Sequence, residues 1–317
     1  MQRYVIRRVL LMIPTLIGVT IIVFLMMRAM PGEITNTIAG EDGAVDSEFR
    51  AAILSELGLD QPMPVQYVRW LSNAVMLDFG TSFVSRRSVS EEFSGRLWIS
   101  LELGVLALLI NTVIGIPLGV ISAVKQNSWI DNIGRSAAVG LLAAPNFWIA
   151  LLLITFAGKY FLWGVPPTSY PSLFDDPIGN IKFMFVPAFI AGASSAGALM
   201  RYTRTAMLEV MRQDYVRTAR SKGLRERIVI TRHIMRNALI PVVTIIGLSI
   251  PGIINGSVLT ETVYSIPGVG RYFVTSIRTL DLPVVQAIVL IQALVLVFAN
   301  LIVDLTYAFL DPRIRYT

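Results

Sequence analysis

Long apolar stretches separated by short polar segments make up most of the chain. Six stretches contain no Asp, Glu, Lys or Arg, at residues 9–27, 103–124, 136–158, 183–200, 237–260 and 282–303. A helix needs roughly 20 residues to cross about 30 Å of hydrocarbon. The stretches lack the two-residue alternation of barrel strands, and in lipid the backbone must be hydrogen-bonded internally. The pattern predicts an all-α integral membrane protein with six transmembrane helices.

The composition agrees with a membrane protein and excludes several kinds of site. The chain is 54% hydrophobic and 15% charged, against about 25% charged residues in an average soluble domain. It has no cysteine, so disulfides, thiolate metal sites and a catalytic thiol are excluded. The net charge of +6 resides beside apolar stretches, where membrane orientation and anionic headgroups account for it better than a nucleic acid does.

The polar segments suggest three parts. Residues 1–29 are expected to be the N-terminal cytoplasmic end and first transmembrane helix, residues 30–96 an external helical segment, and residues 97–317 a five-helix core. In the external segment, Phe49, Ile53 and Leu57 share one helix face ended by Gly58, and Pro64 begins another helix. Lys and Arg are enriched in cytoplasmic loops. With both termini in the cytoplasm, 17 of the 27 Lys and Arg residues lie inside.

The most basic segment is the predicted cytoplasmic loop at about residues 201–238. Between Arg201 and Arg236 it has ten Lys and Arg against three Asp and Glu. Asp214 suits the first turn of a short helix and basic residues its last turn, and Gly223 supplies the left-handed residue that ends it. A second helix is expected over residues 224–236. Asn237 is then expected to cap the next membrane helix.

This loop resembles a known sequence motif. Ala219 and Gly223, four residues apart, are followed by Asn237-Ala-Leu-Ile-Pro241. The spacing resembles the EAA loop of ABC-importer permeases, in the peptide/nickel branch that includes the dipeptide/oligopeptide permease B-like proteins. Arg217 stands where the eponymous Glu would be. The small Ala and Gly suit close approach at a protein interface.

Other stretches resemble the same family. Residues 261–270 and 281–286 are similar to its external re-entry stretch, and residues 57–67 and 78–82 to its external subdomain. The resemblance implies a type I importer permease fold with a small external helical insertion after the first helix. It also implies that the loop couples to an ATPase through these residues: Asp214, Tyr215, Arg217, Thr218, Ala219, Lys222, Gly223 and Leu224.

Enzyme chemistry is not indicated by the sequence. The Gly158-Lys159 pair lacks the rest of a Walker A motif, and a single histidine, His233, cannot form a His-cluster metal site. Polar groups within membrane helices are candidates for a pathway. We single out Asn111, Asn146 and Asn255, together with Glu261 near the predicted outer mouth, where it could meet a substrate amine.

The resemblance implies a permease subunit of a binding-protein-dependent importer in a bacterial or archaeal cytoplasmic membrane, most simply for di- or oligopeptides. Its partners would be a second homologous permease, two cytoplasmic ATPases that bind ATP and Mg²⁺, an external solute-binding protein and membrane lipid, but no nucleic acid. This chain itself would hold no cofactor and no metal. The alternatives are an ion-driven secondary transporter acting alone and a membrane scaffold. The first should show internal repeats and midplane charges, which the sequence lacks.

Overall fold

The computed structural model describes residues 2–28, 61–160, 170–254 and 258–310. Within these ranges the regular structure is helical, apart from one β-bridge between Thr81 and Ser88. Five helices are long and apolar enough to cross a membrane, and a bent pair of shorter helices brings the number to six. The predicted all-α membrane fold is confirmed. The chain forms two compact units, residues 1–98 with 268–317 and residues 99–267; the three-part division stays a prediction.

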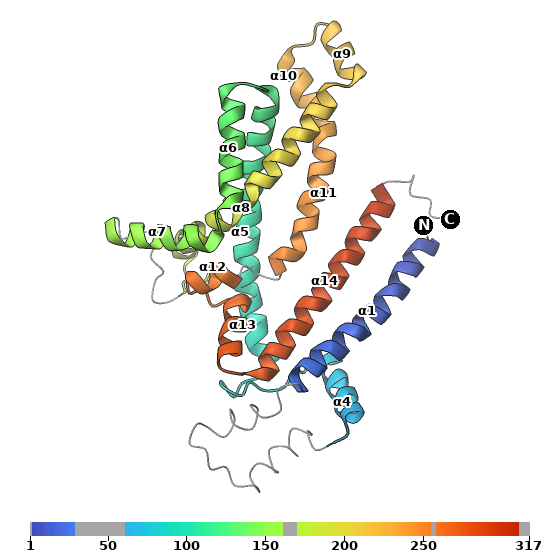
Figure 1. The fold of residues 1–317 in the computed structure, drawn as a ribbon, viewed down its shortest axis with the longest axis vertical. Helices are drawn as coiled ribbons and strands as arrows, with labels where there is room; N and C mark the ends of the chain where they lie inside the picture. The colour runs from blue at the N-terminus through green and yellow to red at the C-terminus, as the bar shows by residue number, and fades with distance from the viewer. Residues whose placement is uncertain (1, 29–60, 161–169, 255–257, 311–317) are drawn as a thin grey trace. The chain divides into compact units, whose positions relative to one another are not determined.

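The first unit is built on two long helices that pack side by side, α1 (Gln2–Arg28) and α14 (Leu282–Leu310) (Figure 1). Helix α4 (Met63–Val75) contacts α1. There the Tyr67 hydroxyl lies 2.8 Å from the Thr20 hydroxyl. Pro64 lies in the first turn of α4, as predicted, whereas the helix expected to end at Gly58 lies outside the described residues.

The segment between α4 and α5 is joined to the residue before α14 in the same unit. The Asp281 side chain is buried; it accepts hydrogen bonds from the Ser82 hydroxyl at 2.5 Å and from the Phe83 backbone N–H at 3.0 Å. Helix α13 (Val269–Arg278) packs against α14. These contacts bring together two of the stretches with family-like sequence, residues 78–82 and 281–286.

The second unit contains most of α5 (Val89–Val124) and the helices from α6 to α12. Helix α8 (Pro177–Met211) packs against α6 (Trp129–Ala143) and α11 (Met235–Ile254). The small residues of α8 permit this packing, because a Cβ on Gly197 would lie 2.6 Å from the Ala138 carbonyl oxygen. Close approach of backbones through small residues is a usual basis of helix packing in membranes.

The third apolar stretch is not one straight span. The structure divides it into α6 and α7 (Asn146–Tyr160), which meet at 94°. Pro145 lies at the break between them. Proline disfavours a helical conformation in the residue before it, and Ala144 has the extended values φ −84° and ψ 124°. The sequence predicted a single helix across this stretch, and that expectation is corrected.

The basic loop contains α9 (Asp214–Ser221) and, after a turn, α10 (Glu226–Ile228). Helix α10 continues without a gap through the π-helix η1 (Val229–Ile234) into α11. In Figure 1, α9 and α10 lie at one end of α8 and α11. The prediction that Asn237 caps a separate helix is wrong. Asn237 lies inside the continuous helix because η1 carries the backbone hydrogen bonding from α10 into α11. Helix α12 (Val258–Val263) completes the unit and contacts α7 and α8.

Candidate functional site

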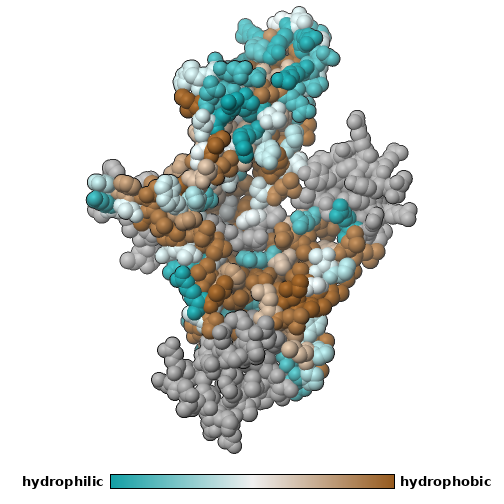
Figure 2. Space-filling view, viewed as in Figure 1, coloured by the Kyte–Doolittle hydropathy of each residue, from teal (hydrophilic) through white to brown (hydrophobic). Residues whose placement is uncertain are grey.

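Seven of the eight residues predicted to couple to an ATPase are exposed on or just after α9. They form the surface that we call the α9 outer face, made of Asp214, Tyr215, Arg217, Thr218, Lys222, Gly223 and Leu224. Figure 2 shows hydrophilic side chains gathered over this end of the second unit. Asp214 occupies the first turn and Arg220 the last, which matches the sign of the helix dipole at each end.

The other face of α9 is buried. Val216 is 0% exposed and Ala219 is 5% exposed, and both belong to a hydrophobic cluster with Ala123 of α5, Met207 of α8 and Ile234 of η1. Ala219 was expected to permit close approach of another protein. Its side chain instead packs against the chain's own core, so its small size serves the seating of α9. The packing couples α9 to α5, α8 and the helix that continues into α11.

The end of α9 is set by Gly223, whose φ is +75°, the left-handed conformation that the sequence predicted. The Gly223 backbone N–H donates to the Arg220 carbonyl at 2.9 Å. Across this turn the Arg220 guanidinium donates to the Glu226 carboxylate at 2.7 Å, and these hydrogen bonds raise the pKa of Arg220. Both side chains are exposed, so the pair contributes little to stability but restrains the turn.

Helix α9 is also tied to α11 by a side-chain hydrogen bond. The Asn237 amide donates to the Tyr215 hydroxyl at 2.9 Å and to the His233 carbonyl at 3.0 Å. Asn237 thus has a tertiary role, since it connects the α9 outer face to the start of a membrane helix.

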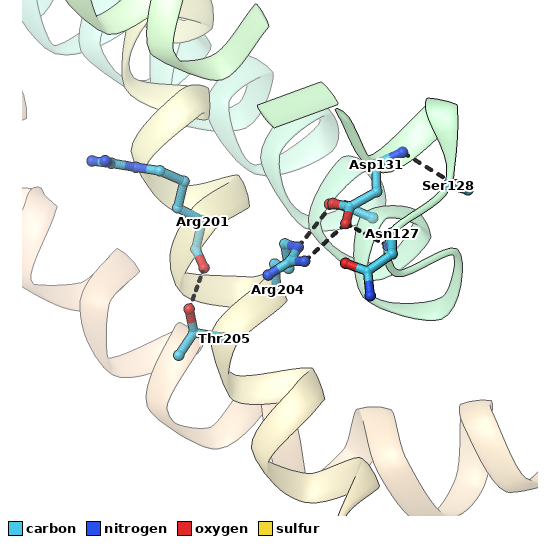
Figure 3. Close-up of polar contacts among 7 residues, drawn as sticks. Asn127, Ser128, Asp131, Arg201, Arg204 and Thr205 are labelled. Carbon is cyan, nitrogen blue, oxygen red and sulfur yellow. Dashed lines mark hydrogen bonds and ion pairs between the residues drawn. The ribbon is translucent and has the colours of Figure 1, made fainter. Parts of the chain in front are cut away.

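A buried ion pair lies near the same end of α8 (Figure 3). The Arg204 guanidinium donates from Nε to Asp131 Oδ1 at 2.9 Å and from its terminal nitrogen to Oδ2 at 2.8 Å. Asp131 Oδ1 also accepts from the Ser122 hydroxyl, and Oδ2 accepts from the Asn127 backbone N–H at 2.9 Å. Asp131 is 0% exposed and the Arg204 side chain 16%. Each oxygen of the Asp131 carboxylate therefore accepts two hydrogen bonds.

The sequence reasoning missed this ion pair, because Arg204 was counted only as one charge of the basic loop. The pair joins the first turn of α6 to α8, three residues before Met207 in the cluster under α9. Ser128 caps α6 by accepting from the Asp131 backbone N–H at 3.3 Å. Asp131 thereby helps to hold three helices in register beside α9.

Two adjoining cavities of about 280 and 370 Å³ lie in the second unit. Asn111 of α5, Asn146 of α7, Ser195 of α8 and Ser249 of α11 line both of them. The other lining residues are mostly small or aliphatic, and within the part of the chain that the structure describes none is charged. Four helices thus bring uncharged polar groups to one place, an arrangement typical of small-molecule sites between helices.

The predicted pathway residues divide into three groups. Asn111 and Asn146 line the cavities, whereas Asn255 lies outside the described residues. Glu261 does not line either cavity; it is 0% exposed and accepts a hydrogen bond from the Ser100 hydroxyl at 2.8 Å. The sequence analysis did not select Ser195 or Ser249, because serine is common in membrane helices, where it often serves close packing of the helices. Among the described residues, no group of three or more His, Cys, Asp or Glu side chains could hold a metal ion.

These features define a polytopic helical membrane protein with an exposed basic helix at one end of a unit that contains uncharged polar cavities. The family described as binding-protein-dependent transport system inner membrane component matches residues 115–316. The N-terminal family of the same transport-system membrane components matches residues 1–104. The chain belongs to this family of permease components, which are not themselves the ATPase.

Characterised relatives cover the full chain. The dipeptide transport system permease protein DppB of Escherichia coli strain K12 is 38% identical over 100% of this chain and 99% of its own. The oligopeptide transport system permease protein AppB of Bacillus subtilis is 41% identical over 100% of both. A crystal structure of an amino acid ABC transporter covers 70% of this chain and 91% of its own at 17% identity, with a TM-score of 0.43, an overlap too partial to add to the family assignment.

Proposed function

We propose that the chain is the permease subunit of a peptide importer, that it forms half of the translocation pathway, and that α9 docks on an ATPase subunit. The coupling role is supported by the two different faces of α9. One face is basic and exposed, and the other is buried against the core through Val216 and Ala219. The peptide substrate follows from the full-length similarity to dipeptide and oligopeptide permeases.

The proposed topology places α9 and both termini in the cytoplasm. The Lys and Arg distribution supports this orientation, because positive residues concentrate on the cytoplasmic side. The partners would be a second homologous permease, two cytoplasmic ATPases and an external solute-binding protein, with the membrane lipid around them. ATP and Mg²⁺ would be held by the ATPases and not by this chain.

The proposed mechanism uses α9 as a rigid connection. When the ATPases close on ATP, they would displace the α9 outer face. The buried contacts of α9 with Met207 and Ile234, and the hydrogen bond between Asn237 and Tyr215, would pass this displacement to α8 and α11. Since those helices carry Ser195 and Ser249 of the cavities, the motion would alternate the exposure of the pathway between the two sides of the membrane.

Crosslinking tests the docking proposal directly, because the chain contains no cysteine and each introduced thiol is unique. We expect Arg217→Cys, carrying a photoreactive maleimide, to crosslink to an ATPase subunit in native membranes. The control is Arg278→Cys on α13, also exposed and on the proposed external side. Absence of an ATPase adduct at position 217, or an equal adduct at position 278, would contradict the proposal.

A further inference from the structure

The four polar side chains that line both cavities indicate what the pathway recognises. We propose that the Asn111 amide oxygen accepts a hydrogen bond from the peptide-bond N–H of the transported peptide, in an uncharged subsite completed by Asn146, Ser195 and Ser249. The inference rests on the proposed peptide-importer function, and it assigns the recognised chemical group as the peptide bond itself, not the charged ends of the peptide.

Asn111 is the strongest indication of a ligand. Its side chain is 8% exposed and lines both cavities, yet its Oδ1 accepts no hydrogen bond from any residue in the described ranges. Buried amide oxygens are nearly always paired, because leaving one unpaired costs free energy. An acceptor held unpaired at the wall of two cavities is therefore suited to a donor that arrives from outside the chain.

The neighbouring hydroxyls make the subsite rich in acceptors. The Ser249 hydroxyl donates its proton to the Ile245 carbonyl at 3.0 Å, and the Ser195 hydroxyl to the Ala191 carbonyl at 3.4 Å. With their protons used in this way, the two oxygens retain lone pairs to accept from a ligand. The Asn146 side chain can both donate and accept. A peptide group, with one N–H and one C=O, matches this set.

The described lining carries no charge, which favours recognition of the neutral peptide bond over recognition of the charged termini. The described lining offers a charged ammonium or carboxylate no opposite charge, so it gives these groups no ion pair by which to recognise them. A neutral peptide group loses less hydration and recovers hydrogen bonds from the subsite. Binding of this modest strength also allows release, which a transport pathway requires.

The test uses the assembled importer in proteoliposomes, with the sister permease, ATPases and binding protein. Uptake of dialanine is compared with uptake of its ester analogue alanyl-lactic acid, in which an ester oxygen replaces the peptide N–H. We expect Asn111→Leu to lower the dialanine-to-ester ratio of kcat/KM by about threefold to tenfold, the effect of one hydrogen bond. The binding protein is the same in both complexes, so its own preference cancels.

Thr112→Val is the matched control on α5, because the Thr112 hydroxyl donates to the Leu108 carbonyl at 2.8 Å and the residue does not line either cavity. It should keep the wild-type ratio. If Asn111→Leu fails to assemble, Asn111→Ala gives the same readout with a smaller side chain. An unchanged ratio, or an equal loss for both substrates, overturns the subsite. Failure of the wild-type complex to take up any short peptide instead contradicts the proposed function.

Discussion

Replacing Asp131 with asparagine would remove the charge that pairs with Arg204 and would disturb every hydrogen bond around it. Asp131 Oδ1 accepts from Arg204 Nε and the Ser122 hydroxyl, and Oδ2 accepts from the Arg204 terminal nitrogen and the Asn127 backbone N–H. An asparagine has one oxygen and one NH₂ group. In either orientation its NH₂ group faces two donors, so this near-isosteric change is not conservative here.

The expected magnitude follows from the burial of the pair. Removal of one partner from a buried ion pair costs about 3–5 kcal/mol, because the other charge is left uncompensated. The Arg204 side chain retains 16% exposure, so water can solvate part of its charge, and we expect Asp131→Asn to cost about 3 kcal/mol. That corresponds to roughly a 100-fold change in the ratio of folded to unfolded protein.

The measurement is SDS-titrated unfolding of the purified chain in mixed micelles, for Asp131→Asn, Arg204→Met and the double variant. Because the double variant buries no unpaired charge, it should be more stable than the sum of the single changes predicts. Asp175→Asn, at an exposed carboxylate, is the control and should change stability by less than about 0.5 kcal/mol. Additivity of the single changes within about 0.5 kcal/mol would refute the coupling.

Two further predictions concern α9. A Cβ at Gly223 would meet no atom of the described residues within 4 Å, so within this part of the chain the φ of +75° is what opposes a substitution. Gly223→Val should therefore impair transport and ATPase stimulation, whereas Gly223→Asn should retain both, because asparagine tolerates this conformation. Equal behaviour of the two variants would contradict the argument. Ala219→Trp should lower the thermal stability of the purified chain, because the larger side chain overpacks the hydrophobic cluster beneath α9. Thr218→Trp, on the α9 outer face, should leave stability unchanged. It should instead block the crosslink between Arg217→Cys and the ATPase.

The membrane spans were largely predictable because the rule behind them is local. A charge-free stretch of sufficient length that lacks the alternation of barrel strands forms helical structure in lipid whatever its neighbours are. The left-handed Gly223 and the proline-initiated α4 followed from equally local preferences. The expectations that the structure corrected concerned features with non-local causes. Proline interrupts helices, so Pro145 favours a break between α6 and α7, but the 94° turn between them also depends on the packing of these helices with α8 and α12. Asn237 has the residue type of a cap, yet η1 extends the helix through it.

The ion pair of Asp131 with Arg204 and the two cavities could not be predicted from the sequence alone. Asp131 and Arg204 are 73 residues apart, and nothing in the local pattern connects them. Asn111 and Asn146 were selected because amides in apolar helices are unusual, whereas serines such as Ser195 and Ser249 are common there. Only the arrangement of α5, α7, α8 and α11 showed that all four line the same cavities.

By itself the sequence determined that this protein resides in a membrane, where its apolar stretches lie and which residue types its basic loop contains. These properties follow from hydrophobicity and from backbone preferences over a few neighbouring residues. Tertiary structure alone decided which face of α9 is free, which acid pairs with Arg204 and which polar groups share a cavity. Such pairings depend on contacts between residues far apart in the chain, whose energies exist only once the helices have packed.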